Sequence, residues 1–213
     1  MKEKQTTHRR QFLRASGILG AGLLMPNINL ACSPQTIQDG NIHLFGKREG
    51  FTDQISILVS MMDWMRATVL ISVKGISEKE LDFLLDKESN SIGAMLMHLA
   101  ATEHYYQIDT FTGVSKSSLG FNVDDDEWGA ASNLGDKGRA TFKRKSLNYY
   151  LDKLEEVREF SLTELKKRDD NWLMESTPFF GNQPTNNYCK WFHVVEHESN
   201  HNGQIKFIKS RVV

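Results

Sequence analysis

The chain of 213 residues is 39% hydrophobic and 25% charged, with 26 basic and 27 acidic residues. This length and composition predict one domain whose core is large enough to fold without disulfides. Residues 1–31 hold five basic residues and one acidic residue, so the remainder carries a formal net charge of −5, which argues against nucleic acid as a partner.

The N-terminal segment has the features of an export signal. A twin-arginine motif at residues 9–14 precedes an apolar run over residues 15–25 and the sequence Leu-Ala-Cys that ends at Cys32. We therefore expect residues 1–31 to be a Tat-type signal peptide and Cys32 to carry a lipid. The protein would then be exported, as a periplasmic protein or as a lipoprotein that meets the membrane through this anchor only. Residues 32–50 are polar with little periodicity and are expected to form a tether.

Residues 51–213 show the apolar periodicity of helices and only weak strand signals. An all-α fold, a bundle of four long helices, is therefore predicted. These helices are expected from Thr52 or Asp53 to Gly75, from residues 89–91 to 112–113, from Ser146 to about residue 168, and from Thr185 or Asn186 nearly to Val213. A capping box at residues 77–80 predicts a short connecting helix after the first of them.

Two long connections separate the last three helices, residues 114–144 and residues 169–184. A connection as long as the first permits a crossover between neighbouring helices that a short turn forbids. The acidic run at residues 124–127 lacks the ligand spacing and the turn glycine of an EF-hand loop. A solvated loop is therefore favoured over a calcium site.

Three histidines recur at intervals of four residues on the final helix: His193, His197 and His201. At 100° per residue, His197 and His201 fall on the apolar side of this helix and His193 lies near its edge. Two imidazoles on one apolar stripe need separate partners for four ring nitrogens, unless they share a metal ion. A metal site is the simpler reading, and buried histidines with separate partners are the alternative.

A fourth histidine, His98, lies on the shoulder of the apolar stripe of the second long helix. Tyr105 follows on the same side, where it would line a pocket or pack in the core. From the residues alone, a single shoulder histidine is more often solvated or bonded locally than a metal ligand. The role of His98 therefore stays open at this point.

Two familiar metal motifs overlap the final helix without fitting their contexts. Residues 197–201 match the zinc-protease pattern H-E-x-x-H, but Gln204 and Phe207 stand where a metzincin needs glycine and histidine. Residues 198–201 match the Glu-x-x-His motif of di-iron bundles, but no second copy occurs. The sequence therefore argues against both a metalloprotease and a di-iron protein.

The chain resembles the DinB-like superfamily of metal-binding four-helix bundles over roughly residues 50–213. Its last helix carries the His-x-x-x-His pair followed by Gly-Gln and an aliphatic residue, at residues 197–205. Residues 91–100 resemble the second-helix motif, whose histidine is His98 here. The resemblance implies a bundle with long crossover connections in residues 51–213, and His98 as the third ligand beside His197 and His201.

The resemblance also implies a chemistry. Three imidazoles would hold one divalent metal ion, zinc, nickel or iron, with an open position for water or a small-molecule substrate. The implied activity is that of a thiol S-transferase or a related hydrolase or isomerase, and a homodimer is compatible with it. Glu198 would orient a ligand or shuttle a proton, unless it is an ordinary exposed helix residue, and Tyr105 and His193 would line the pocket.

Export favours a second function, because low-molecular-weight thiols are mostly cytosolic. A non-enzymatic exported lipoprotein that binds a metal or a small ligand is therefore the alternative.

Overall fold

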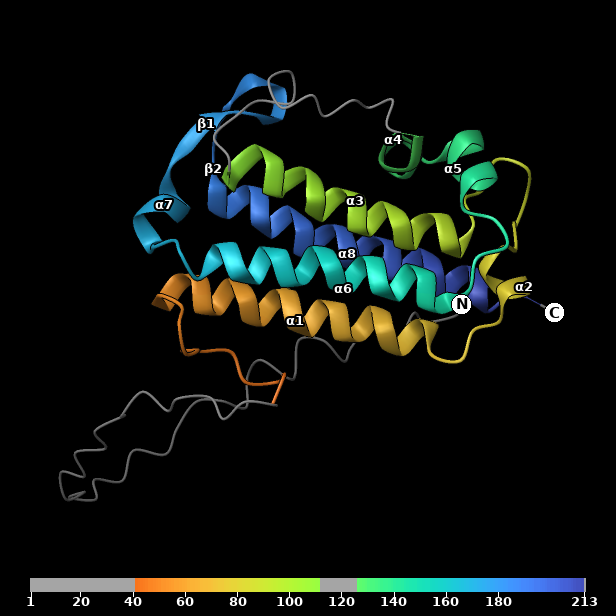
Figure 1. Ribbon diagram of the computed structural model, residues 1–213, viewed down its shortest axis with the longest axis horizontal. Coiled ribbons are helices and arrows are strands. Elements are labelled where there is room, and N and C mark those ends of the chain that lie inside the picture. The colour runs from red at the N-terminus through yellow and green to blue at the C-terminus, as the bar shows by residue number, and fades with distance from the viewer. Residues whose placement is uncertain (1–40, 112–125, 213) are drawn as a thin grey trace, which may run out of the picture. The chain divides into compact units, whose positions relative to one another are not determined.

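The computed structural model describes residues 41–111 and 126–212, and four long helices dominate these residues (Figure 1). These are α1 (Asp53–Val73), α3 (Ile92–Phe111), α6 (Leu147–Leu165) and α8 (Asn187–Lys209). The predicted all-α bundle is confirmed, and each long helix begins within a few residues of its expected start. The predicted signal peptide, Cys32 and the first part of the tether lie outside the described residues.

Contacts between the helices give their directions. Gly93 faces Tyr150, and Gln107 bonds to Ser161, so α3 and α6 run parallel. Tyr106 bonds to His193, near the start of α8, so α8 runs against α3. The connection from α3 to α6 therefore returns the chain to the opposite end of the bundle, as the predicted crossover requires.

The core is built from the apolar stripes of the four helices, and the stripe of α1 runs along the whole helix. Its side chains at Ile55, Leu58, Met62 and Val69 are fully buried. By length and hydropathy α1 is the one described helix that is long and apolar enough to cross a membrane, but 56% of its most apolar window is buried inside the protein. Its apolar character is that of a core helix.

Side-chain caps fix the starts of several helices. The predicted capping box is present at α2 (Glu78–Leu81), where Ser77 and Glu80 each accept the other's backbone N–H. The side chain of Asn186 accepts the backbone N–H of Cys189 and caps α8. Such caps satisfy donors that the helix itself leaves free.

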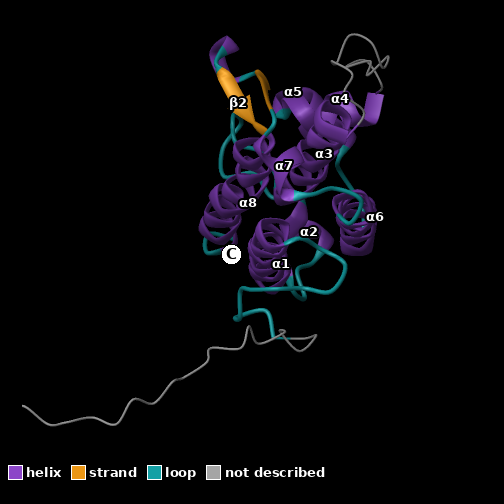
Figure 2. Cartoon of the chain, turned by 90° about the vertical axis from the view of Figure 1, so that its left-hand side faces the viewer, coloured by secondary structure: helices purple, strands orange, loops and turns teal. Residues whose placement is uncertain are grey.

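The connections contain secondary structure that the sequence reading missed (Figure 2). The first holds α4 (Asp126–Asn133) and α5 (Gly135–Thr141), where only a loop was predicted. The second holds α7 (Asp170–Met174) and a hairpin of β1 (Ser176–Pro178) and β2 (Pro184–Asn186), with a short 3₁₀ turn, η2 (Phe180–Asn182), at its tip. Part of the acidic run, residues 124 and 125, lies outside the described residues.

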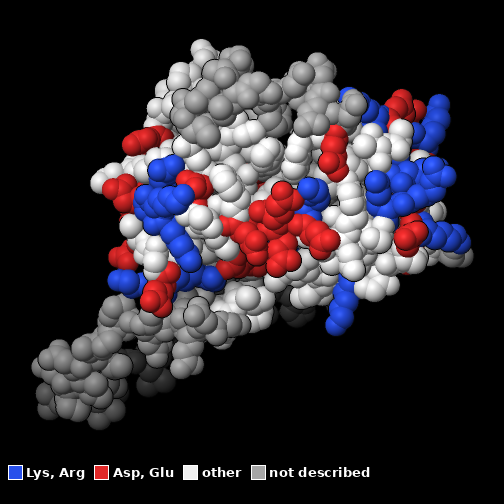
Figure 3. Space-filling view, in the orientation of Figure 1, with Lys and Arg blue, Asp and Glu red and all other residues white. Residues whose placement is uncertain are grey.

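The exposed side of α6 is acidic (Figure 3). Asp152, Glu155, Glu156 and Glu159 border a shallow hollow there. These positions recur at helical spacing on the solvent side, where charged residues are expected. The negative charge of this surface would repel the phosphates of a nucleic acid.

Candidate metal centre

Three of the predicted site residues meet between α3 and α8. His98 comes from α3, His197 and His201 from α8, and each offers a nitrogen within 4.8 Å of those of the other two. The Nε2 atoms of His98 and His197 are 2.8 Å apart. The ring of His201 is centred 4.6 Å from that of His197 and 5.0 Å from that of His98. One turn of α8 and the crossing of α3 are enough to gather the three rings.

The orientation of His98 is set by α4. Its Nδ1 lies 2.8 Å from the carbonyl oxygen of Ala131. A carbonyl accepts only, so Nδ1 carries the proton, and Nε2, which lies 2.8 Å from Nε2 of His197, keeps its lone pair. The connection that was predicted as a loop therefore supplies the group that orients this histidine.

The environment keeps the three imidazoles neutral. Burial lowers the pKa of His98. Burial, with the neighbouring histidines, lowers the pKa of His197 to about 3. Burial, with His98, lowers the pKa of His201 to about 4. Neutral imidazole is the form that binds a metal ion, so the site is in the ligand form at neutral pH.

The donor set fits a divalent cation. Two nitrogens held at about 2.1 Å by one tetrahedral zinc ion lie roughly 3.4 Å apart, and the observed separations start at 2.8 Å and do not exceed 4.8 Å. Within the described residues, Nδ1 of His201 is buried without a hydrogen-bond partner. A buried polar atom of this kind calls for a partner. Small movements of the rings would suffice for a shared ion.

A cavity of about 250 Å³ opens beside the histidines. Its walls are His98, Ala101, Thr102, Tyr105, Tyr106, Ser132, His193 and His197. Both residues predicted to line a pocket, Tyr105 and His193, are among them. The hydroxyl of Tyr106 is hydrogen-bonded to Nδ1 of His193 at 2.8 Å, and burial raises the pKa of Tyr106, so its hydroxyl stays protonated.

A comparison with known protein families identifies the family of this chain. The family model described as mycothiol-S-transferase matches residues 57–212. The chain belongs to this family. The match covers most of α1, all of the other three long helices, the histidines and the cavity, and it agrees with the DinB-like bundle expected from the sequence.

Solved structures support the fold of this mycothiol S-transferase family member. A crystal structure of a protein from Streptococcus pneumoniae superposes with a TM-score of 0.57 at 16% identity, over 75% of this chain and 92% of that one. At this identity the likeness concerns the fold alone. No curated protein matches the chain.

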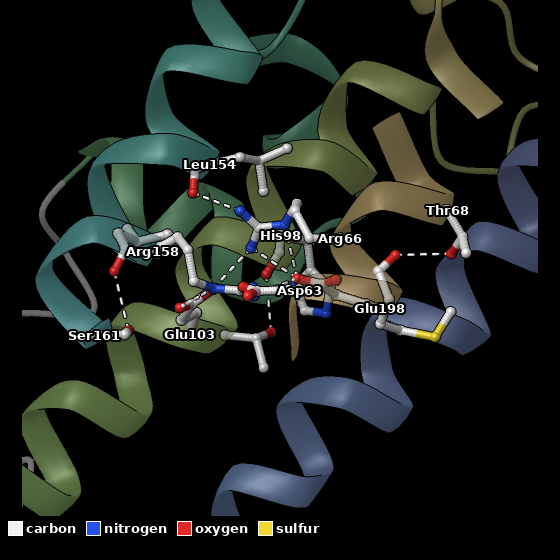
Figure 4. A network of polar contacts seen from close by, with 12 residues as sticks. Asp63, Arg66, Thr68, His98, Glu103, Leu154, Arg158, Ser161 and Glu198 are labelled. Carbon is white, nitrogen blue, oxygen red and sulfur yellow. Dashed lines mark hydrogen bonds and ion pairs between the residues drawn. The ribbon is translucent and has the colours of Figure 1, made fainter. Parts of the chain in front are cut away.

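Glu198, the predicted catalytic candidate, is buried and belongs to the network of polar contacts in Figure 4. It is not among the residues of the cavity wall. Its Oε1 accepts hydrogen bonds from Nε of Arg66 at 2.9 Å and from Nη2 of Arg158 at 3.1 Å. The reading of Glu198 as an exposed helix residue is wrong, because its side chain is only 2% exposed. Its carboxylate is engaged by two arginines.

The two arginines share a second carboxylate, Glu103. Arg158 binds both oxygens of Glu103 at 2.9 and 3.1 Å, and Arg66 binds one of them at 2.8 Å. Burial by itself would raise the pKa of Glu103, but the two guanidinium groups outweigh it and the pKa lies below its usual value. We call Arg66, Glu103, Arg158 and Glu198 the charge network. It joins α1, α3, α6 and α8, one residue from each.

The sequence reading missed the charge network because its members are far apart in the chain. Arg66, Glu103 and Arg158 each sit on the buried side of a different helix. A charged residue within an apolar stripe is the one signal that the sequence offers, since such residues are rarely buried unless they are paired. Which charges pair follows only from the packing of the helices.

Proposed function

We propose that this protein is a metal-dependent enzyme that transfers a low-molecular-weight thiol to an electrophilic small molecule. His98, His197 and His201 would hold one divalent ion, zinc, nickel or iron. The observation that carries the proposal is the convergence of three neutral imidazoles at the wall of a cavity large enough for a small substrate. Membership of the mycothiol S-transferase family supports the same class of reaction.

The bound cation would supply positive charge that favours the thiolate form of the substrate. The protein's own residues orient the metal ligands and shape the cavity. The carbonyl of Ala131 holds His98 in one orientation, and Tyr106 and His193 brace each other across the cavity. In the transfer, the thiol loses its proton to solvent, its sulfur bonds to the electrophilic carbon, and the leaving group departs with the electron pair of the broken bond.

We infer a second candidate function from the expected export signal, an exported lipoprotein that binds a metal or a small ligand without turnover. The same histidines and the same cavity would serve it. The two functions differ in whether a thiol is consumed. Metal content alone does not distinguish them.

The first test is elemental analysis of the purified protein, prepared without chelator and without a histidine tag. We expect about one divalent ion per chain, and loss of it in His98→Ala. His104→Ala is the matched control, because His104 is also on α3 but its ring stacks on Trp128, outside the cluster. A wild-type protein that stays empty after incubation with zinc, nickel and iron would refute the site.

The second test is thiol consumption by the metal-loaded protein in the presence of an electrophile. Turnover that His98→Ala loses and His104→Ala keeps would support the enzyme. Persistent inactivity of the loaded protein across thiols and electrophiles would favour the binding lipoprotein.

A further inference from the structure

Aromatic rings from three parts of the chain are in contact with one another, and three of them, Tyr105, Tyr106 and His193, belong to the cavity wall. Phe179 and Phe180 pack against these three. Tyr105 and Tyr106 belong to α3, His193 to α8, and Phe179 and Phe180 to the tip of the β1–β2 hairpin. Phe179 is centred 6.0 Å from Tyr105 and 5.8 Å from Tyr106, and Phe180 lies 5.4 Å from His193. These are distances at which aromatic rings interact favourably. We call the five residues the aromatic rim.

A buried lysine, Lys190, anchors the hairpin tip to the bundle. Nζ of Lys190 donates to Oδ2 of Asp109 and to Oγ1 of Thr177, both at 2.7 Å, and it lies 4.8 Å from the centre of the Phe179 ring. Lys190 is only 1% exposed, so these contacts are shielded from water. The lysine thus fastens strand β1 to α3 and α8.

The turn itself requires an unusual backbone. Gly181 and Asn182 both have positive φ, 58° and 62°. Glycine adopts this region freely and asparagine tolerates it better than most residues. The turn therefore gives Phe180 a defined position beside His193.

Phe180 contributes little to the core. Its side chain is 43% exposed, and its ring contacts are with Phe179 and with His193, a cavity residue. Its exposed ring touches His193, a residue of the cavity wall, and offers a face on which a ligand can stack.

We infer that the electrophile taken by this site is a planar aromatic or ring-conjugated molecule of about one ring, stacked within the aromatic rim. The size follows from the cavity, whose 250 Å³ lies below the range of roughly 300–1,000 Å³ that is usual for drug-sized ligands. This inference rests on the proposed function, because it names the substrate class of the same site.

The test compares two unreactive probes of similar size. One is 4-(trifluoromethyl)benzamide, which is planar, and the other is 4-(trifluoromethyl)cyclohexanecarboxamide, which has the same substituents on a saturated ring. Fluorine NMR titration gives a Kd for each with the zinc-loaded and with the metal-free full chain. We expect the planar probe to bind about five-fold more tightly, equivalent to about 1 kcal/mol.

Phe180→Ala should remove this preference by weakening the planar probe about five-fold, with little effect on the saturated one. Phe160→Ala is the matched control, because Phe160 is 51% exposed and lies on α6, away from the cavity. Neither substitution removes core packing, so both variants should keep the wild-type circular dichroism and melting temperature.

The outcomes separate the inference from the proposed function. Equal Kd values for the two probes, no measurable binding of either, or equal effects of Phe180→Ala and Phe160→Ala would overturn the aromatic site, even if the protein binds metal and consumes thiol. A preference for the planar probe that Phe180→Ala abolishes would support it, even if no turnover is found.

Discussion

At the scale of single residues, the candidate site depends on groups that touch no cavity. His98 is oriented by a backbone carbonyl of α4, and the helix that carries His197 and His201 is fixed through Glu198, which lies between them in the chain. Groups that orient metal ligands commonly change metal affinity 10- to 100-fold when they are removed. The groups that orient the histidines are therefore expected to affect metal affinity too.

We predict that Glu198→Ala is strongly destabilising. The substitution leaves Arg66 with Glu103 alone and Arg158 with Glu103 and the more distant Asp63, and breaking a buried ion pair in this way costs about 3–5 kcal/mol. Urea unfolding of the metal-free protein measures this loss directly. Glu198→Gln should lose less, since its amide oxygen still accepts a hydrogen bond.

Glu196→Ala is the matched control, because Glu196 is on the same helix but about half exposed. Its effect on the free energy of unfolding should stay within about 0.5 kcal/mol. If Glu198→Ala is no more destabilising than Glu196→Ala, the charge network does not hold the bundle together. If Glu198→Gln keeps its full stability and its bound metal but loses turnover, the prediction that Glu198 shuttles a proton is supported.

Some of these residues could be predicted from the sequence and others could not. His197 and His201 are visible because they repeat on one face of one helix. His98 has no second histidine on its face of α3, because His104 lies six residues further along, so only the family resemblance pointed to it. The charge network and the carbonyl of Ala131 join residues from different helices, and single-helix periodicity carries no information about such contacts.

At the scale of elements, the four long helices were predictable because each buries a stripe with a 3.6-residue period. The short elements were not. Residues 126–142 have few apolar side chains, yet Ala130, Ala131 and Phe142 are fully buried against the bundle. Helices this short are marginal by themselves and form through tertiary contacts, so their sequences look like loops.

The packing of α3 against α6 makes a sharp prediction about two glycines. A Cβ added to Gly93 would lie 2.5 Å from Oη of Tyr150, a side chain that is fully buried and cannot yield. Overpacking of this kind costs about 1–3 kcal/mol. Gly93→Ala should therefore lower the free energy of unfolding, although alanine is the better helix former.

Gly203→Ala on α8 is the matched control, because a Cβ at Gly203 would meet no atom within 4 Å. Replacing glycine in a helix interior by alanine then stabilises by about 0.5–1 kcal/mol. Urea unfolding curves should thus move in opposite directions for the two variants. A stabilising Gly93→Ala would mean that α3 and α6 are further apart than in this structure.

At the scale of the whole molecule, neutral buried histidines make the metal-free fold sensitive to acid. In the unfolded chain the histidine pKa is about 6.5, whereas in the fold it is about 3 for His197 and about 4 for His201. Between these values the unfolded chain binds more protons, so folding stability is fully present above about pH 6.5 and declines as the pH falls toward 4. Glu103, whose pKa is also lowered, adds to the loss at lower pH.

We therefore expect the urea midpoint of the metal-free protein to fall steadily from pH 7 to pH 4.5. His197→Gln should fall less steeply over this interval, because one group that takes up a proton on unfolding has been removed. The same curves with saturating zinc should lie higher at pH 7, by about 2.7 kcal/mol at a free zinc concentration 100 times Kd. This gain should shrink toward acid pH, since protons compete with the metal for the imidazoles. A metal-free protein that becomes more stable as the pH falls, or a His197→Gln variant with an unchanged slope, would show that these rings are not held neutral in the fold.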